Sequence, residues 1–207
     1  MDRSRLEAFS DGVFAVAITL LALNLTVEGP GHGHLQHQLW GHRWSFAAYL
    51  ISFFVIGIIW VNHHVLIRSV ARVDRTLLFV NLVLLLFVVL IPFSTATAAQ
   101  YLPVRNGDAN VAVVLYSAVF LGMSVGFGSI FEWTLHDDHR IVPLPPQAHW
   151  PARLRFAGGS SVYVVSMVVA LFSAYAAFAL IALVAVYYIF ERTPSAPDSG
   201  DDEEPVV

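Results

Sequence analysis

Five apolar runs dominate the sequence and restrict the folds open to the chain. They span residues 6–27, 45–67, 77–99, 111–133 and 156–190. Each of the first four has the roughly 20 residues with which a helix crosses the apolar core of a bilayer, and the fifth has about 35, enough for two short crossings with a break near 173–176. Because a backbone in lipid must satisfy its own hydrogen bonds, the runs predict an all-α membrane protein with six transmembrane helices.

The composition fits this class and excludes several others. Hydrophobic residues make up 57% of the 207 positions and charged residues only 13%, as in membrane proteins. The 11 basic residues are all arginines scattered between the runs, so no nucleic-acid surface is predicted. The absence of cysteine rules out disulfides, thiolate metal sites and cysteine nucleophiles. No hydrolase, zinc-protease or phosphate-binding motif is present, so we do not expect an enzyme.

Arginines in the connections predict the orientation, because cytoplasmic connections carry an excess of basic residues. Nine arginines precede the first run, follow the last, or lie in the second and fourth connections, whereas Arg43 and Arg105 are the two that lie elsewhere. We therefore expect a multi-pass protein of the cell membrane with both termini in the cytoplasm. That arrangement requires an even number of spans, and six supplies it.

Residues 1–192 are predicted to form one transmembrane domain. The first run has features of a signal peptide, with arginines before it and an Ala-x-Ala sequence inside it, but the Ser10-Asp11 pair and the later runs favour a retained helix. Residues 193–207 are rich in Pro, Ser, Asp and Glu and have little to bury. They are expected to be a disordered, acidic cytoplasmic tail.

The first run carries a carboxylate, Asp11, that a simple membrane anchor would avoid. An ionisable group at such a depth is by default a functional hypothesis. At about 100° per residue, one narrow stripe of the helix is almost wholly apolar, and Asp11 points away from it. The stripe consists of Gly12, Val16, Thr19, Leu20, Leu23 and Val27. Such a helix suits the lining of a narrow passage on one side and attachment to its own subunit on the other.

Candidate partners for Asp11 lie near the same predicted depth. A buried carboxylate needs a hydrogen-bond donor or a cation. The candidates are Arg5, Trp60, His63, His64 and Asn81. We favour a polar network of these groups with Ser10 that fixes the helices over direct contact with an ion, because the groups lie off the apolar stripe.

Residues 124–128, Ser-Val-Gly-Phe-Gly, are similar to the Thr-Val-Gly-Tyr-Gly filter of common potassium channels, in which carbonyl oxygens replace the hydration shell of the ion. That filter requires an extended re-entrant loop, whereas these residues lie in the middle of an uninterrupted apolar run. We therefore expect a helix in which Gly122 and Gly126, at small-xxx-small spacing, let a neighbouring helix pack closely.

Two groups of residues raise the possibility of a metal site. They are His32, His34, His37 and His42 in the Gly-rich first connection, and Glu132, His136 and His139 at helical spacing after the fourth run. Neutral imidazoles close in sequence suit Zn, Ni or Cu, and a metal-binding membrane protein is one reading of the first group. An incidental surface run is favoured for the first group and solvation at the interface for the second. No metal ligand is therefore assigned.

The start of the chain resembles a family signature. Arg5-x-x-x-Phe9-Ser10-Asp11 and the Gly-Val-Phe-Ala-Val-Ala-Ile-Thr-Leu-Leu that follows closely resemble the first helix of the lysosomal potassium channel called transmembrane protein 175 and its prokaryotic relatives. Supporting likeness continues through Trp60-x-x-His63-His64, Arg68, Asp74, Asn81 and Pro92-Phe93 and then fades. Animal members carry two six-helix repeats per chain and prokaryotic members one, so this chain is similar to a prokaryotic subunit.

This resemblance implies a homotetramer in the bilayer whose four first helices line a potassium-selective, leak-type pore. By motif position it assigns the narrowest apolar ring to Val16, where the family commonly has isoleucine, and further rings to Leu20 and Leu23. The resemblance also implies a structural hydrogen-bond network of Arg5, Ser10, Asp11, Trp60 and His63 or His64. It implies no cofactor; potassium is the permeant ion.

Rings of Val and Leu offer no ligand to a dehydrated cation, but they block flow by dewetting and favour the ion that sheds its water more easily. We expect a gate at Val16, with Thr19 as the one neighbouring side chain that offers an oxygen, and with the leucine rings influencing selectivity. The alternative function is a proton-coupled secondary transporter that uses Asp11 and His63 as a proton relay.

Overall fold

The computed structural model describes residues 2–104, 106–136, 139–143 and 145–190, and this part of the chain is helical almost throughout. Long apolar sequences give long helices, and most of the Pro- and Gly-containing stretches fall between them. The helical segments are α1 (Arg3–Ala22), α2 (Leu35–Gly41), α3 (Arg43–Arg68), α4 (Arg75–Tyr101), the 3-10 turn η1 (Leu102–Val104), α5 (Gly107–Thr134), α6 (Pro146–Phe172) and α7 (Ala174–Phe190). The tail predicted at 193–207 lies outside the described residues.

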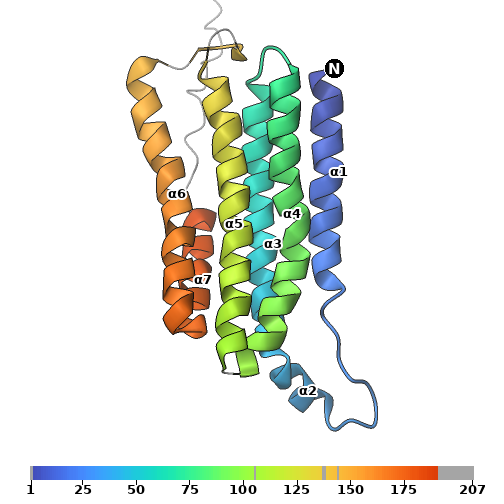
Figure 1. Cartoon of the computed structure of the whole chain (residues 1–207). Coiled ribbons are helices and arrows are strands. Elements are labelled where there is room, and N and C mark those ends of the chain that lie inside the picture. Colours follow the sequence, from blue (N-terminus) through green and yellow to red (C-terminus); the bar gives the residue numbers. More distant parts are fainter. Residues whose placement is uncertain (1, 105, 137–138, 144, 191–207) are drawn as a thin grey trace, which may run out of the picture.

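The long helices lie side by side in one bundle (Figure 1). α4 and α5 form the most extensive contact; α1 packs against α3 and α4, while α6 and α7 pack against α5 and each other. The N-terminus lies at one end of the bundle, and the short α2 lies beyond the other. Helix α1, which carries the predicted stripe, is therefore at the edge of the bundle remote from α6.

The fifth apolar run divides where the sequence predicts. Ser173 has extended backbone angles (φ −154°, ψ 105°) between α6 and α7.

The helix formed by the first run ends earlier than predicted. α1 stops at Ala22, with Leu23 as its C-terminal cap, so the prediction that Val27 continues the stripe is wrong. Asn24, Thr26 and Val27 have low helix propensity, which their position in an apolar run conceals.

Among the described residues, three helical segments are long and apolar enough to cross a membrane: α3, the continuous segment Arg75–Val104, and α5. Shorter apolar helices are formed by Ala157–Phe172 in α6 and by Ala174–Tyr188 in α7. Helix α1 has 20 residues, but several of the first nine are charged. The structure thus supports an all-α membrane protein, and the number of six transmembrane helices stays a prediction.

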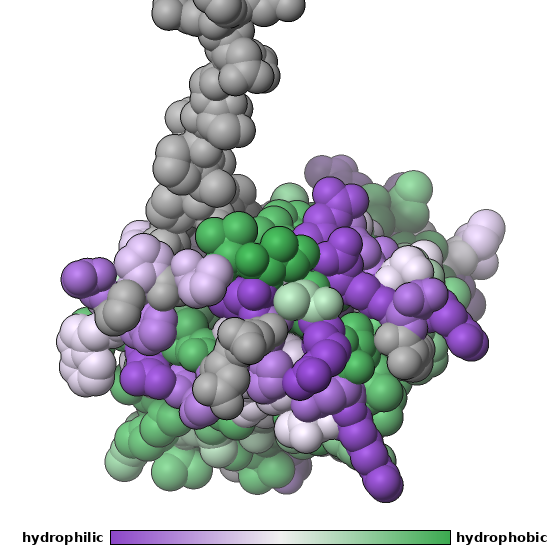
Figure 2. Space-filling view, turned by 90° about the horizontal axis from the view of Figure 1, so that it is seen from above, coloured by the Kyte–Doolittle hydropathy of each residue, from purple (hydrophilic) through white to green (hydrophobic). Residues whose placement is uncertain are grey.

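Large apolar side chains cover the sides of the bundle. Phe54, Phe79, Leu86, Phe93 and Leu183 are each at least 43% exposed. Hydrophilic side chains gather instead over the end that holds the N-terminus, with hydrophobic ones around its edge (Figure 2). This division suits a bundle whose sides meet lipid and whose ends meet water.

Residues 124–128 form part of the continuous helix α5, as the sequence predicts, and not a re-entrant loop. Gly126 is buried against the backbone of α4, where a Cβ atom would lie 2.9 Å from Leu84 Cα. Gly122 is half-buried and faces a side chain of α4, the ring of Phe87. The two glycines therefore allow α4 and α5 to pack closely, as small residues do between membrane helices.

Replacing Gly126 with Ala should destabilise the α4–α5 contact by about 1–3 kcal/mol, because the added methyl group meets backbone that cannot move aside cheaply. The matched control is Gly128→Ala, two residues further along α5, where an added Cβ atom has no neighbour within 4 Å. Thermal unfolding of the purified variants in detergent measures the stability of each. A Gly126→Ala variant as stable as Gly128→Ala would contradict the proposed packing role.

Candidate functional site

Helix α1 buries one side in the bundle and exposes another. Its buried residues recur every three or four positions and face α3 and α4; they are Leu6, Ser10, Phe14, Ala17 and Leu21. The predicted stripe lies on a different side and is uncovered in the subunit. Val16 is 56% exposed, Leu20 38% and Leu23 73%. The bundle therefore leaves free the part of α1 that the sequence assigns to a passage.

Thr19 lies on the same exposed side of α1. Its hydroxyl donates a hydrogen bond to the carbonyl oxygen of Val16 at 2.9 Å. A hydroxyl oxygen that donates its one hydrogen still has lone pairs with which to accept. Thr19 can thus present an acceptor oxygen directly beside Val16, about one helical turn before Leu23.

A chain of hydrogen bonds joins α1 to α4 and α3 in the interior. Asn81 Nδ2 donates to Ser10 Oγ at 3.0 Å, and Ser10 in turn donates to the carbonyl of Leu6. The oxygen of the same amide, Asn81 Oδ1, lies 2.8 Å from His63 Nε2. All three side chains are fully buried. Because Asn81 Oδ1 is an acceptor, the geometry requires His63 to carry its proton on Nε2.

The His63 ring has a second nitrogen that the network leaves unused. Nδ1 is buried and has no hydrogen-bond partner among the described residues. The ring also contacts Phe14 of α1, with the ring centroids 5.4 Å apart. His63 therefore joins α1 through packing as well as through Asn81.

Asp11 takes its partner from α3. Trp60 Nε1 donates a hydrogen bond to Asp11 Oδ1 at 2.8 Å. Asp11 is half-buried and Trp60 is 40% exposed, so this pair lies nearer to the bundle surface than Ser10 and Asn81. Of the predicted candidates, the structure therefore places Trp60 on Asp11 and Asn81 on the neighbouring Ser10, while His63 bonds Asn81.

The remaining contact involves a residue that the sequence analysis missed. Glu7 Oε1 lies 2.8 Å from His64 Nδ1 and 3.5 Å from Arg68 Nε. Adjacent histidines of α3 thus serve different partners, His63 toward Asn81 and His64 toward Glu7. Arg5, predicted to join the network, is exposed and forms no side-chain hydrogen bond or ion pair with any described residue. The sequence signal that could have identified Glu7 is its position four residues, about one helical turn, before Asp11.

The histidine-rich first connection folds around an amide. Gln38 is buried, and its side chain bonds the N–H and the carbonyl of Gly29 and the carbonyl of Gly33. Gly29, Gly31 and Gly33 all have φ between 87° and 99°, a region that favours glycine. Within the described ranges, no group of three His, Cys, Asp or Glu side chains is placed to hold a metal ion.

The second candidate group has structural partners of its own. Glu132 of α5 pairs with Arg153 of α6. His139 stacks on the ring of Trp133, with centroids 3.9 Å apart and planes 7° from parallel. His136 Nδ1 lies 2.9 Å from the carbonyl oxygen of Glu132. These contacts tie the α5–α6 connection to its helices.

Comparisons with known proteins identify relatives of the chain. Residues 5–92 match the family model described as endosomal/lysosomal potassium channel TMEM175. A potassium channel of Streptomyces collinus is 43% identical over 196 residues, which cover 93% of this chain and 94% of that protein. The endosomal/lysosomal proton channel TMEM175 of Homo sapiens is 28% identical over 165 residues, which cover 74% of this chain and 32% of the human protein.

The fold agrees with these matches. The crystal structure of a lysosomal potassium-selective channel TMEM175 homologue from Chamaesiphon minutus is similar with a TM-score of 0.78 and 31% sequence identity, over 90% of this chain and 96% of that one. The relatives are ion channels, so the expectation that the protein is not an enzyme is confirmed. The resemblance seen in Arg5-x-x-x-Phe9-Ser10-Asp11 is also confirmed: this chain belongs to the TMEM175 family of ion channels.

Proposed function

We propose that this protein is a potassium-selective, leak-type channel in which four copies of α1 line one pore. The observation that carries the proposal is the exposed apolar stripe of α1, Val16, Leu20 and Leu23. A single subunit leaves this stripe uncovered, and a closed ring of identical subunits around a shared axis covers it. The stripe then forms successive apolar rings around that axis.

The relatives support the ion and the size of the subunit. The Streptomyces collinus protein is named a potassium channel, and the Chamaesiphon minutus structure is titled a potassium-selective channel homologue. The matches cover nearly the whole length of both, which supports a subunit of one six-helix unit. The six spans are α1 and α3 to α7. The arginines at the N-terminal end of the bundle favour a cytoplasmic N-terminus in the cell membrane.

The proposed constriction works without ion ligands. Val and Leu rings in a narrow pore expel water, and an ion passes only if it can rearrange its hydration shell. Potassium holds water less tightly than sodium, so such a pore prefers potassium. Val16 is the proposed gate, Leu20 and Leu23 extend the apolar stretch, and Thr19 offers an oxygen between them.

The polar contacts of α1 have a structural role in this proposal. Ser10 and Asp11 lie on a side of α1 that differs from the stripe, and they bond to Asn81 and Trp60 within the same subunit. They hold α1 in one rotation, and that rotation directs Val16 away from the bundle. Ser10, Asp11, Trp60, His63, His64 and Asn81 therefore position the pore helix and do not contact the ion.

Potassium flux from vesicles that contain only this protein tests the function. We expect a passive current whose reversal potential follows the potassium gradient and stays unchanged when a pH gradient is imposed. A reversal potential that moves with pH would instead favour the coupled use of protons through Asp11 and His63, or proton permeation of the kind named for the human relative. Absence of potassium flux from correctly assembled protein would refute the proposal.

Val16→Asn should raise potassium flux and weaken the preference for potassium over sodium. A polar side chain at the constriction holds water, so the dewetting barrier falls. The matched control is Val13→Asn, three residues earlier on α1, where the side chain is half-buried against the core. Flux and the permeability ratio, measured on equal amounts of assembled protein, give the result. Unchanged currents in the Val16 variant would remove this residue from the gate.

Asp11→Ala should lower the yield of assembled protein and leave the ion preference of the assembled fraction unchanged. The substitution leaves the Trp60 N–H without its acceptor, a loss of about 1–3 kcal/mol. Trp60→Phe should cost a similar amount, and the double variant little more than either, because the two changes remove one bond. Asp2→Ala is the control, since the Asp2 side chain caps nothing. A fully assembled Asp11→Ala protein with altered selectivity would show that Asp11 acts on the ion.

A further inference from the structure

The first turns of α1 and the last turns of α3 hold each other through complementary groups. Arg3 and Glu7 lie four residues apart on α1, and His64 and Arg68 lie four residues apart on α3, so each pair faces the other helix from consecutive turns. The Glu7 carboxylate lies 2.8 Å from the His64 ring and 3.5 Å from the Arg68 guanidinium. We call these four side chains, with the carbonyls that Arg3 contacts, the α1–α3 clasp.

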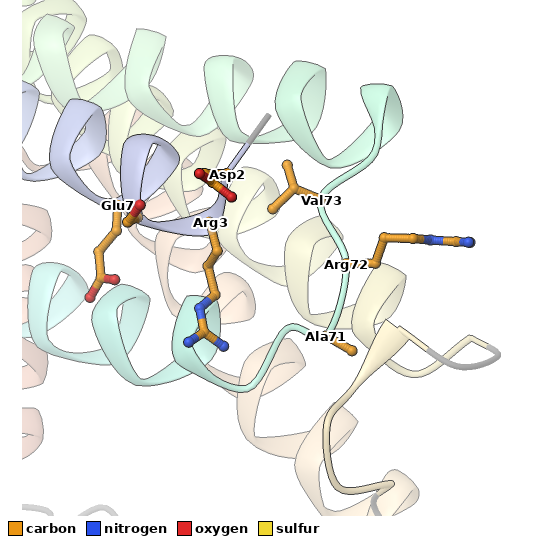
Figure 3. A pocket seen from close by; sticks show the side chains of 7 residues that line it. Asp2, Arg3, Glu7, Ala71, Arg72 and Val73 are labelled. Atoms are coloured by element: carbon orange, nitrogen blue, oxygen red, sulfur yellow. The ribbon is translucent and has the colours of Figure 1, made fainter.

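Arg3 supplies the other half of the clasp. Its Nη1 donates to the carbonyl oxygens of Arg68 at 3.1 Å and of Val70 at 3.2 Å. Arg68 is the last residue of α3, where carbonyls lack helical partners and the helix dipole is negative. The two N–H groups of Nη1 can serve one carbonyl each, so a guanidinium suits this position. Figure 3 shows Arg3 and Glu7 extending toward the end of α3, whereas the nearby Arg72 points away from both.

The clasp lies where α1 has little apolar packing. A pocket of about 590 Å³ separates the start of α1 from the connection after α3, and Asp2, Arg3, Ser4 and Glu7 line its α1 side. Leu6 is the first residue of α1 buried in the core. The polar contacts of Arg3 and Glu7 therefore fix the end of α1 that apolar packing leaves unsupported.

The clasp is itself anchored to the rest of the bundle. Next to Val70, the backbone of Ala71 donates to the carbonyl of His139 at 2.8 Å, and Ile141 donates to the carbonyl of Ser69 at 2.9 Å. These bonds pair the α3–α4 connection with the α5–α6 connection. Arg3 thus attaches α1 to a support held by four other helices.

The clasp also determines which side of α1 faces outward. At about 100° per residue, Val16 lies about 180° around the helix from Glu7, and Leu20 and Leu23 lie within about 40° of that direction. Holding Glu7 on α3 therefore directs the stripe to the opposite side. We propose that Arg3 and Glu7 are positioning residues that fix the rotation of the pore helix, and with it the potassium preference of the constriction.

The test uses Arg3→Ala and Arg3→Lys, with Arg72→Ala as the matched control, because Arg72 lines the same pocket and points away from the clasp. The chain has no cysteine, so Ser4→Cys accepts a single spin label at an exposed site beside Arg3. Label mobility reports the anchoring of α1 without any flux measurement. The ratio of potassium to sodium flux from vesicles reports the rotation of the constriction.

Arg3→Ala should make the spin label more mobile and lower the ratio of potassium to sodium flux by about threefold. This is the change in an equilibrium constant expected when one or two partly exposed charged hydrogen bonds are lost. Arg3→Lys should retain most of both properties, and Arg72→Ala should match the wild type. If Arg3→Ala does not assemble, Glu7→Gln tests the other half of the clasp. A label as immobile as in the wild type, or a freed label with an unchanged flux ratio, would overturn the inference.

The part of this inference that concerns potassium preference rests on the proposed channel. Different results would refute the channel and the clasp. A wild-type protein without potassium flux would refute the channel, while the spin label would still show whether the clasp holds α1. Wild-type flux together with an unaffected Arg3→Ala variant would refute the clasp and leave the channel standing.

Discussion

The structure depends on the need of buried polar groups for partners. Ser10, Asn81 and His63 are fully buried and Asp11 is half-buried, and such groups without hydrogen bonds would cost several kcal/mol in an apolar interior. Only one rotation of α1 satisfies them together, because their partners lie at fixed positions on α3 and α4. The hydrogen bonds on one side of α1 fix the rotation of the helix, and this rotation determines which apolar residues are exposed on the other side.

Much of the fold was readable from the sequence, because span length and apolarity are properties of the chain itself. The helices follow the predicted runs, and the break at Ser173 lies where the excess length of the fifth run required one. The end of α1 was misjudged because Leu25 and Val27 are as apolar as the helix before them. Hydropathy measures transfer to lipid and carries little information on where helical hydrogen bonding stops.

The sequence predicted which residues belong to the candidate site better than it predicted which of them pair with each other. Trp60, His63, His64 and Asn81 were identified as a set, but a one-residue step along α3 turns a side chain by about 100°. That step sends His63 into the core and His64 to Glu7. Glu7 and Arg3 were missed because polar residues at the start of an apolar run resemble ordinary interfacial residues. The partners of Arg3 are the backbone carbonyls of Arg68 and Val70, and because every residue has a carbonyl, the sequence does not reveal which ones are used.

The contacts of α1 are divided unevenly along its length. Polar bonds hold residues 3–11, and beyond them Phe14, Ala17 and Leu21 pack through apolar surface alone. Polar bonds therefore hold the N-terminal half of α1, and apolar packing holds the C-terminal half. Leu23 lies about 10 Å farther along the axis than Val16. In the proposed channel, a tilt about the end of α1 held by polar bonds would displace Leu23 the most, so the ring of Leu23 would change its width more than the ring of Val16.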